Sequence, residues 1–579
     1  MASGSALVVA AIDFGTTYSG WAFSFKHEFE RDPTKVSAKT WRGGQLSSLK
    51  GPTCVLINPD GKTLETFGFE AEKRYTELAE EDAHKKWFYF RRFKMSLWNK
   101  VCHVSQYKLE DESGKELPAM TVFSLSIRFL KDELLKTSGD QIGGNGLEPE
   151  DIHWVLTVPA IWNDAAKQFM REAAQEAGIL QNMLTIALEP EAASLYCRHL
   201  PVEKGDNSRT CLSKFGAGKK YLVLDAGGGT VDITVHEVGP SGDLKELHKA
   251  SGGAWGGTKV DEAFMNFLGQ LAGLDVIERF KDVNMEDYID LLRDFEIKKR
   301  DIAPSKDSKV TIKLPIALSE LVREMKGTEL KSKIQQSGLG EKAKLTGDKL
   351  RLEASVVKTF FQTSISSCVK HVSDLLDEPV NHGVQAILMV GGFSESPMLQ
   401  EMFKIKFPKL TIITPPEAGL AVLKGAVIFG HSPKSISERV SKYTYGTDIT
   451  VPFDESKHPW SKRKEYKNGE VRCNDIFSKL VELGQTMIVG QPQDAQNFTP
   501  IFDDQKSMSM NIYAAQSKDP KFVTDYGCQQ IGSFSVPMTG TGTDRSVTVR
   551  MTFAGTEIDV ECKQKDTSNV THLKVDFLS

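Results

Sequence analysis

The feature that most constrains this chain is a short unit that occurs twice. The first copy is an apolar run from Leu7 that ends in the turn DFGTT, beginning at Asp13. The second copy is the apolar run YLVL, which ends in the turn DAGGGT, beginning at Asp225. When Asp13 is superimposed on Asp225, Gly15 lies on Gly227. One Asp-x-Gly turn is a weak signal, because β-hairpins use these residues for turn geometry alone. Two copies, each crowded with Gly and Thr, predict a duplicated strand–turn–strand unit in two similar domains.

The chemistry of both turns favours a nucleotide. Glycines let backbone N–H groups approach phosphate oxygens, and threonine hydroxyls add donors. No Gly-Lys-Ser/Thr follows either turn, and a strand comes next, so neither turn is a Walker-type P-loop. A carboxylate at the end of a buried strand is costly unless it meets a positive group. We therefore expect Asp13 and Asp225 to face one Mg²⁺ and its waters, while the two turns hold one triphosphate from opposite sides.

Three further stretches fit around such a cleft. In MLTIALEPEAAS, Glu189 lies at the carboxyl end of a buried strand, where α/β folds bind ligands, and Pro190 starts a helix. The strand AILMV precedes the Gly391-Gly392 pair, whose bare backbone suits a flat adenosine. The helix PPEAGLAVLKGAVIFG is rich in Gly and Ala, which indicates either a crossing at a hinge between two lobes or simple tight packing.

Composition limits the class of protein. The chain has 579 residues, too many for one core, with 40% hydrophobic and 26% charged residues, as in an ordinary globular protein. A net charge of −5 gives no electrostatic case for nucleic acid as a partner. No stretch approaches the ~20 apolar residues of a membrane span, and we expect no signal peptide. Eight cysteines without paired spacing are typical of reduced thiols and predict a cytoplasmic location.

The ordered motifs IDFGTTYS, EPEAAS, LDAGGGTVD, VGGFSESP and PPEAGLAVLKGA resemble the superfamily of actin, sugar kinases and 70-kDa heat-shock chaperones. The stretches VLTVPAIWNDAAKQFMREAAQEAGI and GGTKVDEAF are similar to the heat-shock branch in particular, and the resemblance covers roughly residues 6 to 430. The details resemble the divergent heat shock 70 kDa protein 12 (12A/12B) type. The resemblance implies an α/β fold, a two-lobed actin-like ATPase of duplicated ribonuclease H-like domains with inserted subdomains.

The resemblance also implies roles for the residues that match the family motifs. Asp13 and Asp225 would hold Mg²⁺ through waters, with Thr230 near the γ-phosphate. Glu189 and Asp232 would orient the attacking water or its proton path. The remaining nucleotide contacts would come from Gly15, Thr16, Thr17, Tyr18, Gly227, Gly228 and Gly229 at the phosphates and from Glu296, Lys299, Arg300, Gly391, Gly392 and Phe393 at the adenosine.

The catalytic lysine of the family falls in WFYFRRFKMSLW, where Lys94 matches it. Arg91 or Arg92 could take that role instead, and a basic helix face explains the cluster equally well. Several departures from the family pattern stand out. Phe393 replaces a small polar residue, Glu191 replaces a threonine, and HSPKSISERVSKYTYG replaces the recognisable interdomain linker, which puts coupling between domains in question.

From about Ser441 the pattern changes to period-two runs, such as the alternating apolar residues of 547–553, 558–562 and 573–577. These runs predict a small antiparallel β domain with one buried face and no helical lid. The predicted domains are an N-terminal lobe at 1–220, a C-terminal lobe at 221–435 and the β domain at 441–579. We expect proteins or peptides, and co-chaperones, as partners, with weak and rapidly released binding at the β domain.

Three functions remain open at this point. The first is a Mg²⁺-dependent ATPase that acts as an atypical chaperone or a nucleotide-gated protein-binding switch. The second is a nucleotide-binding scaffold with little hydrolysis, and the third is a small-molecule kinase of the same superfamily. The β-rich tail and the heat-shock motifs argue against the kinase, but the sequence does not separate the first two.

Overall fold

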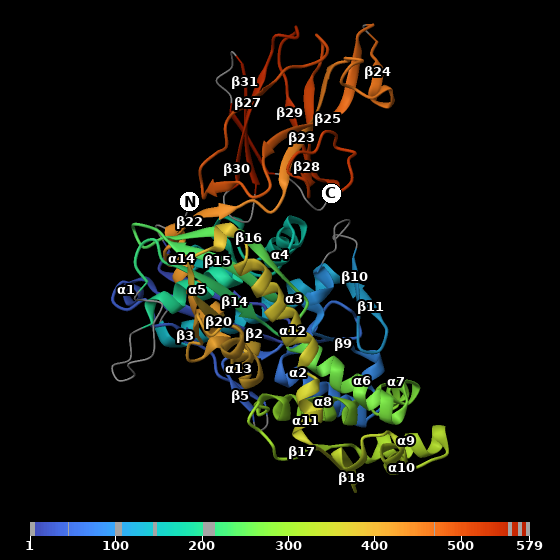
Figure 1. The fold of residues 1–579 in the computed structure, drawn as a ribbon. Coiled ribbons are helices and arrows are strands. Elements are labelled where there is room, and N and C mark those ends of the chain that lie inside the picture. Colours follow the sequence, from blue (N-terminus) through green and yellow to red (C-terminus); the bar gives the residue numbers. More distant parts are fainter. Residues whose placement is uncertain are drawn as a thin grey trace.

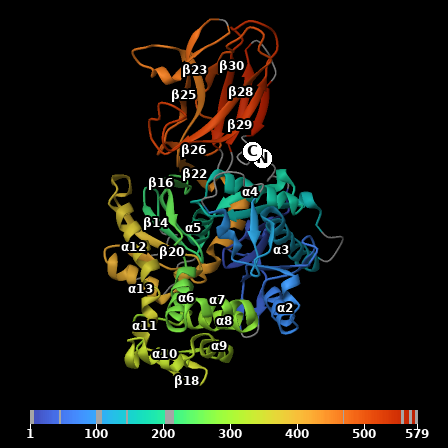
Figure 2. The same ribbon diagram turned by 90° about the vertical axis from the view of Figure 1, so that its right-hand side faces the viewer.

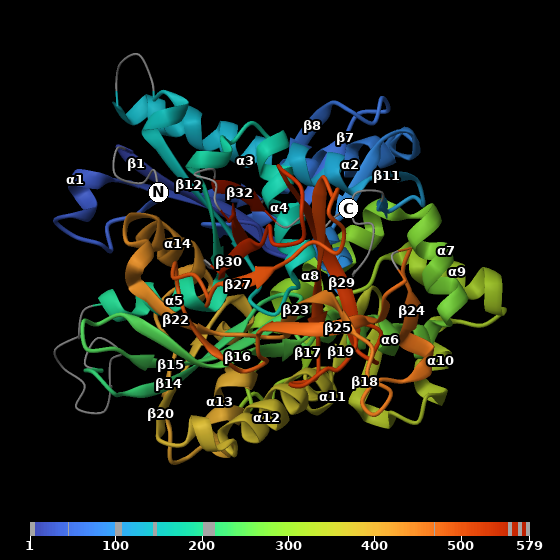
Figure 3. The same cartoon turned by 90° about the horizontal axis from the view of Figure 1, so that it is seen from above.

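Two α/β lobes lie side by side, and a β-rich region covers one end of the pair (Figure 1 and Figure 2). The computed structural model describes residues 6–43, 46–98, 107–142, 147–200, 215–467, 469–553, 558–565 and 570–574. Seen from above in Figure 3, the blue elements of the first lobe lie on one side and the green and yellow elements of the second lobe on the other.

The first lobe is built on a mixed sheet with the strand order β13-β12-β1-β2-β3, and β6 pairs with β2 outside this path. Strands β1, β12 and β13 run parallel, and β2 turns back antiparallel to β1 after the first Gly-Thr turn. The strands are β1 (Val8–Asp13), β2 (Tyr18–Phe25), β3 (Ser37–Ala38), β6 (Gly51–Pro52), β12 (Ile152–Val158) and β13 (Leu184–Leu188). Its helices are α1 (Lys26–Phe29), α3 (Ala119–Ile142), α4 (Asp164–Glu176) and α5 (Glu189–His199).

The second lobe repeats this arrangement. Its sheet has the order β21-β20-β14-β15-β16-β22-β26, and the first five strands match the first sheet in order and direction. The strands are β14 (Lys220–Ala226), β15 (Val231–Val238), β16 (Leu244–Gly253), β20 (Val384–Val390), β21 (Thr411–Ile413), β22 (Ile436–Val440) and β26 (Thr486–Ile488). The duplicated α/β architecture that the two turns predict is therefore confirmed.

Smaller elements are inserted into each lobe, as the fold class predicts. In the first lobe they are β4 (Trp41–Gly43), β5 (Leu46–Ser48), β7 (Cys54–Ile57), β8 (Leu64–Phe67), α2 (Phe69–Glu80), β9 (Phe88–Arg91), β10 (Lys108–Glu110) and β11 (Glu116–Pro118). In the second lobe they are α7 (Leu274–Val283), α8 (Met285–Arg300), β17 (Val310–Lys313), α9 (Ile316–Lys326), α10 (Leu330–Gln336), β18 (Ala343–Thr346), β19 (Lys349–Leu352) and α11 (Ala354–Thr359). The remaining helices of that lobe are α6 (Thr258–Ala272), α12 (Gln362–Leu376), α13 (Pro397–Lys406) and α14 (Ala421–His431).

Helices α5 and α14 pack against each other between the two central sheets, and α14 also contacts β1 and β12 of the first lobe. Gly425 of α14 allows this close approach, because a Cβ atom there would lie 1.7 Å from the Ala192 carbonyl oxygen of α5. The helix that the sequence describes as rich in Gly and Ala therefore lies where the lobes join. At this junction the structure shows tight packing of the two helices.

The β-rich region consists of two antiparallel sheets that share a core. One sheet contains β23 (Thr444–Pro452), β24 (Arg463–Glu465), β25 (Val471–Val481), β28 (Ser507–Ala515) and β29 (Cys528–Pro537). The other contains β27 (Gln496–Phe498), β30 (Val547–Phe553), β31 (Ile558–Gln564) and β32 (Val570–Lys574). Alternate residues of β30 and β31 are buried, as their period-two pattern predicts. The last predicted alternation extends to Val575 and Phe577, which lie outside the described residues.

The β-rich region is joined to the second lobe by strand pairing. Strand β22, in the stretch that replaces the family linker, runs parallel to β16, and β26 pairs antiparallel with β22. One strand of the predicted 441–579 segment thus belongs to the sheet of the second lobe, and the predicted domain boundaries stay a prediction. Across the described ranges, no helix has the length and apolar character to cross a membrane. No disulfide joins the cysteines in the described part of the chain.

Candidate functional site

The two Gly-Thr turns meet face to face at the junction of the lobes. A Cβ atom on Gly228 would lie 2.2 Å from Thr17 Oγ1, and one on Gly229 would lie 2.7 Å from Thr16 Oγ1. In the first turn, a Cβ on Gly15 would lie 2.1 Å from the Tyr18 carbonyl oxygen. Only glycine fits these positions, so the threonines of one lobe contact the bare backbone of the other.

The start of α6 holds the second turn in place. The backbone N–H groups of Gly256, Gly257 and Thr258 donate to the carbonyl oxygens of Gly229, Gly227 and Gly228, at 3.0, 3.1 and 2.8 Å. The first residues of the motif GGTKVDEAF therefore stabilise the second turn through backbone hydrogen bonds. Gly256 and Gly257 were not identified as site residues from the sequence, although Gly-Gly-Thr at the beginning of a helix was a signal for them.

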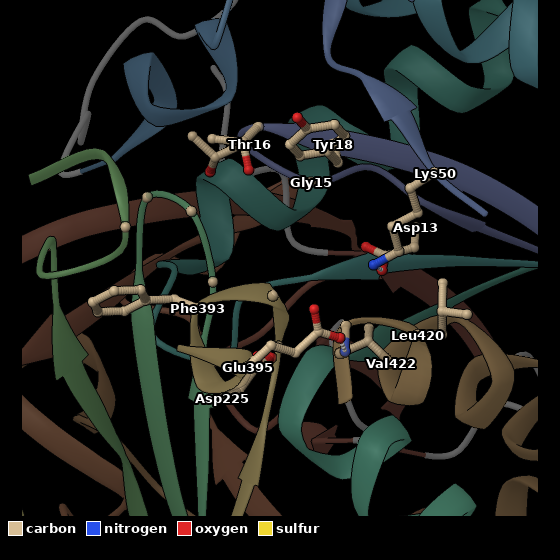
Figure 4. A pocket seen from close by; sticks show the side chains of 18 of the residues that line it. Asp13, Gly15, Thr16, Tyr18, Lys50, Asp225, Phe393, Glu395, Leu420 and Val422 are labelled. Atoms are coloured by element: carbon tan, nitrogen blue, oxygen red, sulfur yellow. Dashed lines mark hydrogen bonds and ion pairs between the residues drawn. The ribbon is translucent and has the colours of Figure 1, made fainter. Parts of the chain in front are cut away.

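A cavity of about 600 Å³ opens at these turns. Its walls include the phosphate-turn residues and, at the other end, the predicted adenosine residues Glu296, Lys299, Arg300 and Gly391–Phe393. In Figure 4, Thr16 and Tyr18 lie on one side of the cavity, while Phe393 and Glu395 lie on the other. The volume is within the range of ligand sites for small molecules. The predicted catalytic residues Asp13, Lys94, Glu189, Asp225 and Thr230 line it as well.

Four carboxyl groups gather at the phosphate end: the buried Asp13, Asp225 and Asp232, and Glu189, whose side chain is 12% exposed. Burial, followed by the charges of Glu189, Asp232 and Asp13, raises the pKa of Asp225 well above its usual range. Burial also raises the pKa of Glu189, to about 7, and the pKa of Asp232. Oδ2 of Asp225 and Oδ2 of Asp232 are buried without a hydrogen-bond partner among the described residues. This concentration of negative charge favours a cation between the acids.

Asp13 already has a positive neighbour in the protein. Nζ of Lys50 lies 2.5 Å from Asp13 Oδ2, and Thr157 Oγ1 donates to Asp13 Oδ1 at 3.0 Å. The sequence did not identify Lys50, because nothing in the loop QLSSLKGPT marks this lysine as part of a site. Lys50 reaches Asp13 only through the tertiary fold, from the segment before β6.

The carboxyl cluster fits a hydrated Mg²⁺ better than a directly chelated metal. No group of three or more His, Cys, Asp or Glu side chains in the described ranges has the arrangement that holds a metal directly. Mg²⁺ usually keeps several waters and needs only one or two carboxylates besides the substrate phosphates. The unpartnered oxygen of Asp225 and the buried Asp13 meet that requirement. A bound Mg²⁺ would neutralise phosphate charge at this end of the cavity.

Lys94 lies beside Glu189 in the short 3-10 helix Phe93–Leu97. Its Nζ lies 2.6 Å from Glu189 Oε1 and 5.3 Å from the centre of the Trp162 ring, and the residue is 1% exposed. Arg91 and Arg92 both line a second cavity, and Arg92 pairs with Asp261 at 2.9 Å. Of the three basic candidates, only Lys94 lines the first cavity, but its catalytic role stays a prediction.

Asp232 faces the lobe junction from β15. Its Oδ1 accepts a hydrogen bond from the Ile161 N–H, in the first lobe, at 2.9 Å. The side chain of Thr230 also donates to Asp232 and lowers the pKa of this carboxyl against the larger effect of burial. Asp232 therefore connects the second turn with the segment that leads from β12 into α4.

At the adenosine end, three charged residues of α8 interact on one helical face, as their spacing predicts. Glu296 accepts from Lys299 at 2.5 Å and from Arg300 Nη2 at 2.8 Å. The Arg300 guanidinium carbon lies 5.4 Å from the centre of the Tyr18 ring, so this cluster also contacts the first lobe. These residues pair their charges with one another, and their contact with a base stays a prediction.

The Gly391-Gly392 turn completes that end of the cavity. Gly391 has φ of +84°, and a Cβ there would lie 2.4 Å from Asp225 Oδ1, whereas a Cβ on Gly392 would meet open space. Phe393 is buried and lies over Gly257 rather than solvent. The sequence did not identify Glu395, whose Oε1 accepts the N–H of Gly419 at 3.0 Å and joins this turn to the segment before α14.

Comparisons with known proteins bear on this arrangement. A family model described as Hsp70 protein matches residues 145–435. Heat shock 70 kDa protein 12A of Mus musculus is 35% identical over 99% of this chain and 92% of its own length. Heat shock 70 kDa protein 12B of Homo sapiens is 34% identical over 99% of this chain and 91% of its own length. The chaperone protein DnaK of Thermotoga neapolitana is 25% identical over 48% of this chain and 40% of its own length.

Proposed function

Since the chain belongs to the Hsp70 protein family and is related over nearly its whole length to heat shock 70 kDa proteins 12A and 12B, we propose that it binds ATP and ADP with Mg²⁺. The proposed site is the cavity between the two lobes. The observation that carries the proposal is the direct contact of the two Gly-Thr turns beside four carboxyl groups, three of them buried. Such turns offer backbone donors to phosphates, and the acids favour a hydrated cation beside them.

We propose further that the chain hydrolyses ATP slowly. In this proposal Thr230 and Lys94 act on the phosphate that leaves, and Glu189 and Asp232 hold the attacking water or receive its proton. The raised pKa of Glu189 supports a proton-accepting role, because a base works best when its pKa lies near the working pH. The contribution of the protein would be positioning and electrostatic stabilisation, as in other phosphoryl-transfer enzymes.

The β-rich region would bind proteins or peptides, so that the chain acts as an atypical chaperone or a nucleotide-gated protein-binding switch. Its two-sheet core and its strand pairing with the second lobe support a folded unit attached to the nucleotide cleft. We propose a cytoplasmic location, because the spacing of the eight cysteines is typical of reduced thiols. Imaging of the tagged protein tests that location.

Calorimetry of the full chain with ADP and with ATP, each with and without Mg²⁺, tests the binding proposal. We expect both nucleotides to bind more tightly with Mg²⁺, and binding of neither would refute the proposal. Single-turnover release of γ-phosphate then tests hydrolysis. Thr230→Ala should slow that release by about 10²-fold or more while ADP affinity changes little, because its hydroxyl acts where charge develops in the transition state.

Two alternatives have distinct outcomes in the same experiments. A nucleotide-binding scaffold would bind ADP and ATP but release no γ-phosphate above the background rate. A small-molecule kinase would transfer the γ-phosphate to an added sugar or polyol faster than to water. The family membership and the β-rich region favour the first proposal over the kinase.

A further inference from the structure

A second cavity of about 630 Å³ lies beside the first, on the far side of Tyr18 and Glu296. Elements of both lobes form its walls. Strands β4, β7 and β9 and helix α2 come from the first lobe, and α8 comes from the second. Thr17, Tyr18 and Glu296 line both cavities, so the two spaces are separated by shared side chains. None of the nucleotide roles proposed above uses the second cavity.

Three of the five cations that line the second cavity have no close ion-pair partner among the described residues: Arg42, Lys73 and Arg91. The guanidinium groups of Arg42 and Arg91 make no hydrogen bond and no ion pair with any described residue. Arg91 is only partly exposed, at the end of β9, and the charges of Glu112 and Glu72 act on it, but both carboxylates already pair with other cations, Lys281 and Arg293. Lys73 of α2 has its nearest carboxylate at 3.9 Å, on Glu77. An arginine cannot lose its charge in a protein, so this wall stays positive at any working pH.

Most acids in the second cavity are already neutralised by other cations. Glu72 is buried and accepts from Arg293 Nε and Nη2, at 3.1 and 2.9 Å. Glu296 is paired with Lys299 and Arg300. Glu70 lines the cavity as an exposed residue, and one exposed carboxylate does not balance three cations. The cavity therefore presents an excess of positive charge to whatever enters it.

The lining also has an apolar part. Phe69 comes from the start of α2, and Leu292 and Ile297 come from α8 on the opposite wall. A bare anion would leave this surface in contact with water. A molecule that carries both an anionic and an apolar group would contact both parts of the lining.

We propose that the second cavity binds a small phosphorylated organic molecule, whose phosphate contacts Arg91 and whose organic part lies against Phe69, Leu292 and Ile297. A phosphate matches the planar, forked donors of arginine and carries enough charge to attract Arg42 and Lys73 as well. A bound molecule would touch both lobes. It would therefore change nucleotide affinity through the shared residues, and the effect would be reciprocal.

Phenyl phosphate is the probe for this inference. The full chain is first saturated with ADP and Mg²⁺, so that the first cavity is filled, and phenyl phosphate is then titrated by calorimetry. We expect one molecule to bind, and we expect phenol, which lacks the phosphate, not to bind. Arg91→Met should weaken binding of phenyl phosphate by at least about tenfold, the effect of losing a charge-assisted contact. Arg550→Gln, on the exposed face of β30, is the matched control and should leave it unchanged.

Several outcomes would overturn the inference. They are no binding of phenyl phosphate, equal binding to the wild type and to Arg91→Met, and complete displacement of phenyl phosphate by ADP. A second variant, Arg42→Gln, tests the inference if Arg91→Met does not fold. Arg42 is exposed, so its loss should weaken binding of phenyl phosphate without disturbing the core. The inference does not rest on the proposed nucleotide function. If ADP fails to bind, the titration without ADP still compares the wild type with Arg91→Met.

Discussion

At the residue scale, the site depends on how a few buried charges are paired. Lys94 is 1% exposed, and its nearest acid is Glu189, at 2.6 Å. Burying an ammonium group is costly, and a single ion pair does not always offset that cost. The buried position of Lys94 beside a cavity therefore supports the proposed contact with a bound nucleotide rather than a gain in stability.

Lys94→Ala should reduce single-turnover release of γ-phosphate by about 10²-fold or more, because a donor aimed at developing charge is lost. ADP affinity should change far less. Lys94→Arg should not restore the rate, since a planar fork does not replace a compact ammonium in a closed space. The control is Arg92→Ala, whose guanidinium pairs with Asp261 instead. If Arg92→Ala slowed release as much as Lys94→Ala, the assignment of Lys94 would be wrong.

At the element scale, the lobes are held together by a close crossing of α5 and α14. The carbonyl oxygen of Ala192 lies where a Cβ on Gly425 would be, and neighbouring Ala residues of both helices are buried. Backbone atoms cannot move aside as the end of a flexible side chain can. The crossing should therefore tolerate no larger residue at this position.

Gly425→Ala should lower the free energy of unfolding by about 1–3 kcal/mol, the usual cost of overpacking. Urea unfolding followed by circular dichroism measures this change in the free energy of unfolding. Gly139→Ala is the control, because Gly139 lies in α3 and a Cβ there meets no atom within 4 Å. That change should stabilise the helix by roughly 0.5–1 kcal/mol. Equal behaviour of the two variants would mean that the helices separate easily to admit a methyl group.

The elements encoded by local sequence patterns could be predicted, and the contacts between distant segments could not. Both turns, their aspartates and the strands around them follow from local patterns. Gly and Thr indicate turns, and alternating apolar residues indicate strands, within a few positions of the chain. The contact of Lys50 with Asp13 and the bracing of the second turn by Gly256 depend on segments far apart in the chain. The pairing of β22 with β26 depends on how the β-rich region sits on the lobe. No local pattern encodes such contacts.

At the scale of the whole molecule, β22 connects the nucleotide cleft with the β-rich region. Arg439 of β22 is buried and donates through Nε to Glu191 Oε1 at 2.7 Å. Glu191 lies in the first turn of α5, two positions after Glu189, and Val440 N–H donates to the buried Glu246. The unusual glutamate at position 191 thus has a partner in the equally unusual linker. This pairing provides a direct route by which the two regions could influence each other.

Arg439→Met should lower the free energy of unfolding by about 3–5 kcal/mol, because it leaves Glu191 charged and buried without its partner. The double variant Arg439→Met/Glu191→Leu should recover most of that loss, since position 191 then no longer holds a buried carboxylate without its partner. The control is Arg550→Met, which removes an exposed pair with Glu561 at 3.7 Å and should cost under about 1 kcal/mol. If the double variant were no more stable than Arg439→Met, the pair would not account for the loss.

Lys442 lies at the same junction, and its environment should make stability depend on pH. Its Nζ donates to the carbonyl oxygens of Ala160 and Trp162 in the first lobe. Burial lowers the pKa of Lys442 to about 7, and the nearby charges are those of Lys167, Asp164, Asp232 and Glu246. An unfolded lysine has a pKa of about 10.4, so between these values the unfolded chain binds more protons at this residue. The contribution of Lys442 to stability therefore rises with pH across that window.

The difference in unfolding free energy between the wild type and Lys442→Met isolates this contribution from the other titrating groups. Measured in urea at pH 7.5, 8.5 and 9.5, that difference should shift in favour of the wild type as pH rises, by at most about 1.4 kcal/mol per pH unit. Lys563→Met, at an exposed position of β31, is the control for the loss of a lysine as such. Parallel curves for the wild type and Lys442→Met would mean that Lys442 stays charged in the folded protein. The carbonyl oxygens of Ala160 and Trp162 would then have to stabilise a full ammonium charge at the joint between the first lobe and the β-rich region.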